Sequence, residues 1–335
     1  MAKMVGVDLG TANTLICMRG EGIVIRSPSA VAIDKDTREI IAQGREAKQM
    51  MGKTPMGILA FRPLKDGVIT DADVTAGMLR NYFRHMGAIS TFSRPLVVAS
   101  VPYGVTEVEK RAIEDAAFEA GARRVALMEE PVAAALGTGL RIGGPKGTMI
   151  VDVGGGTTEV AVISLGGIVA SQSLRIAGDE LDEAIVAYLR ETRGILIGEA
   201  TAEELKIRIG SAHKDRERGG VTVSGMHLLR RMGVMFEVQT GEVREAMSEA
   251  LDQIILAIAR TLERTPPEIS SDLYDFGLVL TGGGAMLPGL AALIFERTGM
   301  KVRIANRPME SVCAGMLRVI DGAGEAEGLL RFRER

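Results

Sequence analysis

The stretch VDVGGGTTEV, residues 151–160, places an aspartate, three consecutive glycines and two threonines between apolar residues. A glycine run weakens a strand, because it gives up side-chain packing and costs backbone entropy. Its position directly after a buried-looking strand indicates that something approaches this backbone closely. A phosphate chain is the first candidate, because backbone N–H groups in a glycine-bearing turn can form a concave anion site.

The same unit occurs twice in the chain. VGVDLGTANTLICMRGEGIV near the start and IVDVGGGTTEVAVISLGGIV in the middle both read strand, Asp, glycine and threonine turn, strand, turn, strand. The aspartates are Asp8 and Asp152, so the unit recurs after 152 − 8 = 144 residues. Two like halves, each with one hairpin, predict a cleft with a phosphate loop on either side.

The two aspartates suggest a magnesium ion. Asp8 and Asp152 precede their loops, DLGTANT and DVGGGTT, and are badly placed to touch a phosphate. They are well placed to hold magnesium through water, because this ion keeps much of its hydration shell. Either loop alone would equally fit an ordinary hairpin with a tight glycine turn. The two together, with matched aspartates, favour a nucleotide site.

Composition and element order bound the fold class. The length of 335 residues predicts two domains, and 46% hydrophobic with 25% charged residues is typical of a soluble globular protein. Strand-like runs alternate with helical periods, which predicts an α/β protein. The uncharged segment 277–295 approaches the length of a bilayer span. Three glycines and Pro288 interrupt it, so we expect a strand, a glycine turn and a helix.

Several other functions are disfavoured. The net charge of −3 gives no support to nucleic-acid binding. Cys17 and Cys313 fit no CxxC spacing and predict reduced, buried residues of a cytoplasmic protein. The segment AKQMMGKT, residues 47–54, lacks the first glycine of a P-loop and a preceding apolar strand.

Three further segments are weaker candidates. The turn TGGGAMLPG, residues 281–289, offers side-chain-free backbone to a base and ribose, and helix 201–210 offers polar partners to a sugar or base. For that helix, an exposed amphipathic helix is the alternative. In EEPVAAALGTG, residues 129–139, acidic residues at a helix start are explained by the helix dipole alone. The functional alternative is that one glutamate polarises water attacking a γ-phosphate.

The motifs together resemble the MreB family, the bacterial actins of the cell-shape system, within the actin, sugar-kinase and heat-shock chaperone superfamily. The resemblance rests on GVDLGTANTLI, RPLKDGVI, EEPVAAALG, VDVGGGTTEVAVISLG, IGEATAEELKI and LTGGGAMLPGL, which run in family order over nearly the whole chain. It implies an actin-like, two-lobed ATPase fold with a duplicated ribonuclease H-like core and four subdomains. The first lobe would span 1–140 with an insertion at about 30–70, and the second 141–320 with an insertion at about 181–238. Residues 321–335 would be a tail, either frayed or a short helix.

The resemblance also implies roles for individual residues around ATP and Mg²⁺. Asp8 and Asp152 would face the metal through water. Glu130 would act on the attacking water, with Thr157 helping to place it. The phosphates would be held by Thr11, Ala12, Asn13, Gly154, Gly155, Gly156 and Thr157. The adenosine would be surrounded by Glu203, Glu204, Leu205, Lys206, Gly282, Gly283, Gly284, Ala285 and Met286.

The implied function is slow ATP hydrolysis coupled to assembly into paired antiparallel filaments. These would lie at the inner face of the cytoplasmic membrane, contact membrane proteins of the elongation machinery and guide wall synthesis and rod shape. In GAISTFSRP, residues 87–95, Ile89 and Phe92 would insert into the membrane. The alternative is an ordinary loop that folds onto the protein.

Three other classes share the phosphate-binding chemistry. A small-molecule kinase would need a substrate cleft with a carboxylate base, and no such insertion is apparent in the sequence. A heat-shock chaperone ATPase would need a peptide-binding domain after residue 335. A plasmid-segregating actin does not share the ISLG, GEVREA and TPPE strings.

Overall fold

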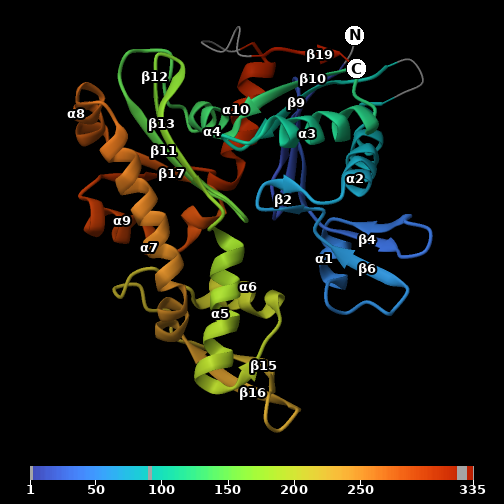
Figure 1. Ribbon diagram of the computed structural model, residues 1–335, viewed down its shortest axis with the longest axis vertical. Coiled ribbons are helices and arrows are strands. Elements are labelled where there is room, and N and C mark those ends of the chain that lie inside the picture. Colours follow the sequence, from blue (N-terminus) through green and yellow to red (C-terminus); the bar gives the residue numbers. More distant parts are fainter. Residues whose placement is uncertain (1–2, 90–92, 323–329, 335) are drawn as a thin grey trace.

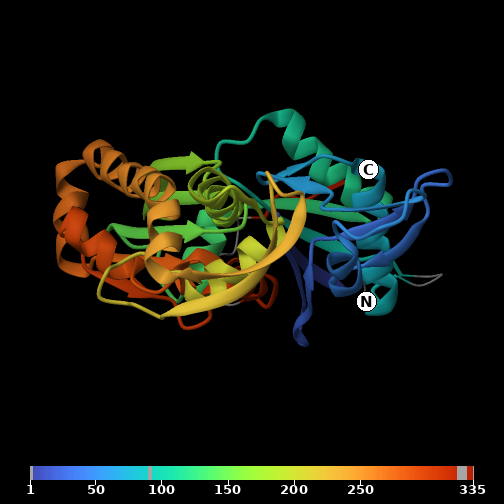
Figure 2. The same cartoon turned by 90° about the horizontal axis from the view of Figure 1, so that it is seen from below.

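The computed structural model describes residues 3–89, 93–322 and 330–334. Figure 1 shows two lobes, each built around a sheet, with a smaller part hanging below each of them. Seen from below, the lobes lie side by side, and the outer part of the second lobe crosses in front in yellow (Figure 2). The predicted α/β class is confirmed by this arrangement of sheets and helices.

The first lobe is built on a six-stranded sheet in the order β19-β10-β9-β1-β2-β3. The strand β1 pairs antiparallel with β2 and parallel with β9, so a hairpin is joined to a parallel pair. Helices α2 and α3 pack on this sheet, and Asp71 caps α2 by accepting a hydrogen bond of 3.1 Å from the Val74 N–H. The elements are β1 (Met4–Leu9), β2 (Asn13–Met18), β3 (Gly22–Pro28), β9 (Leu96–Val101), β10 (Arg124–Glu129), β19 (Arg333–Glu334), α2 (Ala72–His85) and α3 (Glu107–Glu119).

A small part of the first lobe lies between β3 and α2. It has its own three-stranded sheet in the order β5-β4-β6 and a core of small side chains, followed by a short hairpin. Its elements are β4 (Val31–Asp34), β5 (Ile40–Gln43), α1 (Arg45–Met50), β6 (Ile58–Phe61), β7 (Leu64–Lys65) and β8 (Val68–Ile69).

The second lobe repeats the plan of the first. Its five-stranded sheet has the order β13-β12-β11-β17-β18, and β11 pairs antiparallel with β12 and parallel with β17, as β1 does with β2 and β9. Helices α5, α7, α8 and α9 share one hydrophobic core with this sheet. The elements are β11 (Thr148–Val153), β12 (Thr158–Ser164), β13 (Gly167–Leu174), α5 (Gly178–Arg193), α7 (Thr240–Arg264), α8 (Pro267–Phe276), β17 (Leu278–Thr281), η1 (Gly283–Met286), α9 (Leu290–Thr298) and β18 (Val302–Ile304).

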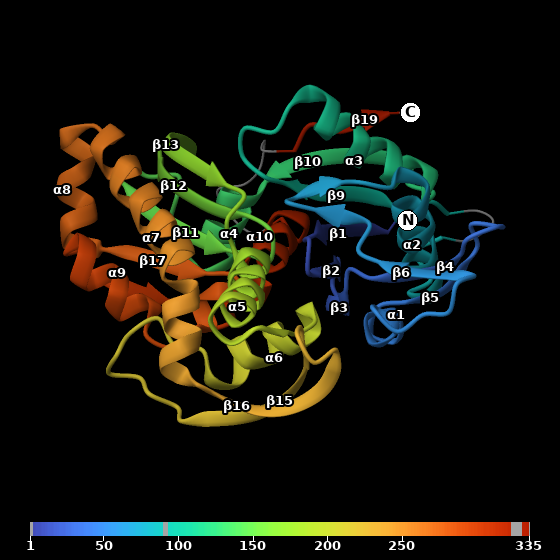
Figure 3. The same ribbon diagram turned by 60° about the horizontal axis from the view of Figure 1, so that its bottom comes forward.

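The outer part of the second lobe lies between α5 and α7. A three-stranded sheet in the order β14-β15-β16 packs beside α6, and Figure 3 shows α6 facing α1 of the first lobe. The elements are β14 (Ile195–Leu196), α6 (Glu199–Ile209), β15 (Gly220–His227) and β16 (Met232–Gln239).

Two helices, α4 (Glu130–Gly137) and α10 (Ser311–Ile320), lie between the two large sheets and share a core with both. The backbones of the two helices are in direct contact where they cross, because a glycine of each helix lies against the backbone of the other. An added Cβ on Gly137 would lie 1.8 Å from the Ser311 carbonyl oxygen, and one on Gly315 would lie 1.8 Å from that of Ala133. Any side chain at either glycine would therefore push the helices apart.

The prediction for residues 277–295 is confirmed, whereas the prediction for the C-terminal tail is partly wrong. The uncharged stretch 277–295 forms β17, η1 and α9, as expected, and none of the helices in the described residues is long and apolar enough to cross a membrane. The expectation of a frayed or helical tail is wrong for Arg333 and Glu334. These residues form β19 against β10, because the open strand edge accepts backbone pairing. Ion pairs from Arg333 to Glu114 and from Arg124 to Glu334 reinforce it.

Candidate functional site

The loops of the two repeated hairpins meet at a cavity of about 530 Å³ between the lobes. This volume is within the usual range for a small-molecule site. The cavity is lined by most of the residues that the sequence predicted, drawn from both lobes. They are Asp8, Thr11, Ala12, Asn13, Glu130, Asp152, Gly154, Gly155, Gly156, Thr157, Glu203, Lys206, Gly282, Gly283, Gly284 and Met286.

The glycines after Asp152 allow the two loops to touch. An added Cβ on Gly155 would lie 2.7 Å from the Cβ of Ala12, and one on Gly156 would lie 2.8 Å from Oγ1 of Thr11. A side chain at either glycine would separate the loops. Part of the space that the glycine run creates is therefore filled by the opposite loop of the same chain.

A third backbone segment, the turn between β7 and β8, completes this junction. The Gly67 N–H donates a hydrogen bond of 3.0 Å to Oγ1 of Thr11. Asp66, with φ of 52°, lies in the left-handed region, and its backbone nitrogen would be 3.0 Å from a Cβ at Gly156. The sequence motifs did not predict this contribution, although an Asp-Gly pair is a strong turn signal.

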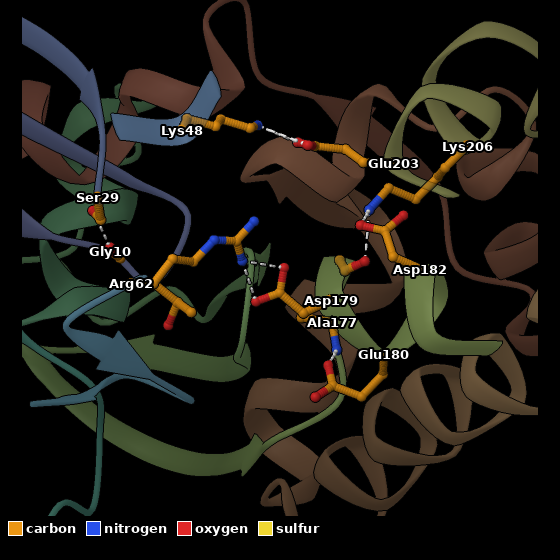
Figure 4. A network of polar contacts seen from close by, with 12 residues as sticks. Gly10, Ser29, Lys48, Arg62, Ala177, Asp179, Glu180, Asp182, Glu203 and Lys206 are labelled. Atoms are coloured by element: carbon orange, nitrogen blue, oxygen red, sulfur yellow. Dashed lines mark hydrogen bonds and ion pairs between the residues drawn. The ribbon is translucent and has the colours of Figure 1, made fainter. Parts of the chain in front are cut away.

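The start of α5 fixes the second loop from behind. The N–H groups of Gly178 and Asp179 donate to the carbonyl oxygens of Gly154 and Gly155 at 3.2 and 2.7 Å. Lys206 from α6 donates to the Gly178 carbonyl at 2.6 Å and to the Asp182 carboxylate at 2.8 Å (Figure 4). Backbone hydrogen bonds from the start of α5 thus hold the loop of residues 154–157, and the partly buried Lys206 in turn fixes the start of α5.

Three residues predicted to surround the adenosine are not at the cavity wall. Because α6 is a helix, its successive side chains point in different directions. Leu205 is buried in the core of the second lobe, and Glu204 forms a surface ion pair with Arg208. Ala285 is buried in the same core as Leu205. Glu203 and Lys206 remain on the cavity side of α6.

Four carboxyl groups gather at the cavity. Burial raises the pKa of Asp8 to about 6, although the Ser100 hydroxyl donates to it at 2.9 Å and opposes the rise. Burial and the nearby Asp8 raise the pKa of Asp152 to about 7. Burial, followed by repulsion from Asp8, Glu159 and Asp152, raises the pKa of Glu130 well above its usual value. Burial raises the pKa of Glu159 to about 8.

This cluster has the charge that suits a divalent cation. Within the described ranges, none of these four side chains forms an ion pair with a lysine or arginine. Those ranges also hold no group of three or more Asp, Glu, His or Cys side chains arranged to ligate a metal directly. The carboxyl groups therefore fit a hydrated cation, whose charge would offset their repulsion through intervening water.

Two ion pairs cross from one lobe to the other at the mouth of the cavity (Figure 4). Lys48 of α1 lies 2.7 Å from a carboxylate oxygen of Glu203 on α6. Arg62, just after β6, donates to both carboxylate oxygens of Asp179 at 2.7 and 2.8 Å. Sequence reasoning missed both pairs, because a charged residue alone does not reveal a partner more than a hundred positions away.

The predicted membrane residues are placed only in part. Ile89 is half-buried and packs against the core of the first lobe, where its Cδ1 would lie 2.7 Å from a Cβ at Gly121. Phe92 lies outside the described residues.

Two lobes with duplicated hairpins, a helix pair between them and a cavity at the hairpin loops define an actin-like protein. Solved structures agree with this class. The MreB 5 structure of Spiroplasma citri bound to AMPPNP has a TM-score of 0.90 at 35% identity, over 94% of this chain and 95% of that chain. The MamK double helical filament has a TM-score of 0.81 at 23% identity, over 95% and 98%, and shares the fold.

The chain belongs to the MreB/Mbl family. The family model described as MreB/Mbl protein matches residues 2–327. The cell shape-determining protein MreB of Escherichia coli K12 is 48% identical over 327 residues, or 95% of this chain and 94% of that protein. The cell shape-determining protein Mbl of Bacillus subtilis 168 is 43% identical over 320 residues, covering 96% of each. The resemblance inferred from the motifs is thus confirmed.

The raised carboxyl pKa values predict how stability depends on pH without nucleotide or metal. Asp8, Asp152 and Glu159 have folded-state pKa values of about 6, 7 and 8, above the ordinary values of about 4. The folded state therefore binds more protons than the unfolded state between about pH 4 and pH 8. We expect the free energy of unfolding to fall as pH rises through this window, by up to about 1.4 kcal/mol per pH unit for each proton.

Urea denaturation in EDTA at several pH values measures this slope. Asp152→Asn should make the slope shallower, because one of the titrating groups is removed. A stability that stays level or rises over this window would contradict the expectation.

The cross-lobe ion pairs predict that reversing one charge loosens the cavity mouth. Lys48→Glu should speed hydrogen exchange in α1 and α6, because it replaces attraction with repulsion from Glu203, whereas global stability changes by less than about 1 kcal/mol. The swap Lys48→Glu with Glu203→Lys should restore the slow exchange. Arg244→Glu is the matched control, because its partner Glu217 belongs to the same lobe. Unchanged exchange in Lys48→Glu would show that the pair does not hold the lobes together.

Proposed function

We propose that this chain is an ATP-dependent, actin-like cytoskeletal protein that polymerises at the inner face of the cytoplasmic membrane and directs cell-wall synthesis and rod shape. The observation that carries the proposal is the pair of glycine loops, each preceded by a buried aspartate, that face one cavity from opposite lobes. The similar MreB/Mbl proteins are named as cell shape-determining. The similar Spiroplasma citri structures are bound to AMPPNP and to ADP.

In this proposal, ATP lies in the cavity with its phosphates between the two hairpin loops. Thr11 to Asn13 and Gly154 to Thr157 supply backbone and hydroxyl donors to the phosphates. Glu203 and Lys206 of α6, with Gly282, Gly283, Gly284 and Met286, lie around the adenosine. Asp8 and Asp152 would hold Mg²⁺ through water, and the bound ion would supply positive charge beside the phosphates.

Hydrolysis depends on Glu130, which directly follows β10 at the first turn of α4. Its carboxylate accepts a hydrogen bond from the water that attacks the γ-phosphate, and Thr157 helps to place that water. Because the site is divided between the lobes, we expect slow turnover that speeds up when assembly holds the lobes closed.

Assembly and attachment complete the proposal. The filaments are paired and antiparallel, contact membrane proteins of the elongation machinery and lie peripherally on the membrane from the cytoplasmic side. Residues 87–95 provide the membrane contact through Ile89 and Phe92. The packing of Ile89 against the first-lobe core means that this segment would have to rearrange to insert that side chain. Two apolar side chains contribute a few kcal/mol at most, so attachment depends on many copies in one filament.

Electron microscopy of the purified protein on anionic liposomes tests this function, with and without Mg-ATP. We expect paired filaments on the membrane only when nucleotide is present. Filaments that form in solution but never on liposomes would reject the membrane part of the proposal. A protein that stays monodisperse and phosphorylates an added metabolite would instead indicate a small-molecule kinase of the same superfamily.

The role of Glu130 predicts a specific separation of binding from hydrolysis. Glu130→Ala should retain ATP affinity and assembly but lower phosphate release by about a hundredfold or more, because a positioned acid–base group typically contributes that much. Glu129→Ala is the matched control, because this neighbour is exposed and does not line the cavity. Loss of ATP binding in Glu130→Ala would show that the residue is structural.

A further inference from the structure

Glu159 is a buried acidic residue to which the sequence analysis gave no role. It is the second residue of β12, whose other members are apolar apart from a threonine and a serine at the two ends. The side chain is only 2% exposed. Burying a carboxyl group there is costly unless it is satisfied by a partner.

The strand register directs Glu159 toward the catalytic side of the sheet. It is the cross-strand neighbour of Asp152, and such neighbours lie on the same face. Ala161 and Ile163, two and four residues further along the strand, pack in the core that contains α4. Since α4 begins with Glu130, Glu159 approaches Glu130 from the opposite lobe, and its charge contributes to the raised pKa of Glu130.

The two carboxylate oxygens of Glu159 have different surroundings. Oε1 accepts a hydrogen bond of 2.6 Å from the Ser173 hydroxyl. Oε2 is buried and has no hydrogen-bond partner of normal distance and angle within the part of the chain that the structure describes, although the Tyr103 backbone N–H lies close enough to lower the pKa of this carboxyl group. Glu159 also lines the cavity. Because a buried oxygen without a partner is rare and costly, Oε2 points to a hydrogen-bond donor that occupies the cavity.

We propose that Glu159 is a second catalytic carboxyl group, whose Oε2 accepts a hydrogen bond from the same water that Glu130 activates. This inference rests on the proposed ATPase function. The water oxygen forms a bond to the γ-phosphorus, and the bond to the β–γ bridging oxygen breaks with its electron pair going to ADP. One water proton goes to Glu130, and the other stays on the new phosphate while Glu159 holds the water in line.

This arrangement makes hydrolysis depend on both lobes at once. Glu130 follows a strand of the first-lobe sheet, and Glu159 belongs to a strand of the second-lobe sheet. A water held between them is correctly oriented only when the lobes are closed. Closure of the lobes would therefore start the reaction without any change in the residues that bind the nucleotide.

Single-turnover phosphate release from Glu159→Gln tests the inference, together with the affinity for Mg-ATP measured with a fluorescent ATP analogue. Glutamine keeps the size of the side chain and removes one buried acid, so we expect folding to be retained. Phosphate release should fall about 10- to 100-fold, with ATP affinity within about threefold of wild type. Glu249→Gln is the matched control, because it makes the same chemical change at an exposed residue that does not line the cavity, and it should stay within about threefold in both measurements.

A double-mutant cycle with Glu130→Gln separates a shared water from two independent effects. If both groups hold one water, the double variant should release phosphate within about threefold of Glu130→Gln alone. The inference would be overturned if Glu159→Gln released phosphate at the wild-type rate. It would also be overturned if the fold-losses of the two single variants multiplied in the double variant. A tenfold weaker dependence of ATP affinity on Mg²⁺ in Glu159→Gln would overturn it as well, because it would place the residue at the metal. If Glu159→Gln failed to fold, Glu159→Asp would replace it. The aspartate side chain is shorter by one methylene, so its carboxylate would no longer reach the water and phosphate release should slow in the same way.

A failure of the proposed function gives a different result. Wild-type protein that binds Mg-ATP but releases no phosphate in any assembly state overturns the ATPase and, with it, the role of Glu159. Wild-type turnover that is unaffected by Glu159→Gln overturns the inference alone.

Discussion

The contact between the two hairpin loops is the constraint on which the rest of the structure depends. Gly155 and Ala12 approach at backbone distance, and this contact fixes how the two sheets face each other. Asp8 and Asp152 end the strands that enter these loops, so bringing the loops together also brings the acids together. The cavity, the repulsion among the carboxyl groups and the fit to a hydrated cation all follow from that approach.

The lobes are held at two further places of different physical character. At the crossing of α4 and α10 the contact is between backbones and is surrounded by a hydrophobic core shared with both sheets. At the mouth of the cavity the contact is made by the Lys48–Glu203 and Arg62–Asp179 ion pairs. These pairs are partly exposed and sensitive to salt. The two lobes are thus joined by close backbone packing at one place and by partly exposed ion pairs at the other.

The sequence predicted what local patterns encode and missed what only distant contacts reveal. The duplicated hairpins and their aspartates were recognisable because each follows from a short run of residues. The ion pairs across the lobes were not, because Lys48 and Glu203 are 155 positions apart and nothing local marks them as partners. Helical periodicity could have shown that Glu204 and Leu205 do not face the same way as Glu203. An acid inside the apolar run of β12 could likewise have drawn attention to Glu159.

The strand β19 has a practical consequence. By pairing with β10, it brings residues near the C-terminus back to the outer edge of the first-lobe sheet, far in sequence from its other strands. A fluorescent protein or affinity tag inserted directly after Glu334 would therefore lie beside a sheet edge. A tag inserted in an exposed turn, such as that between β15 and β16, would leave this edge undisturbed.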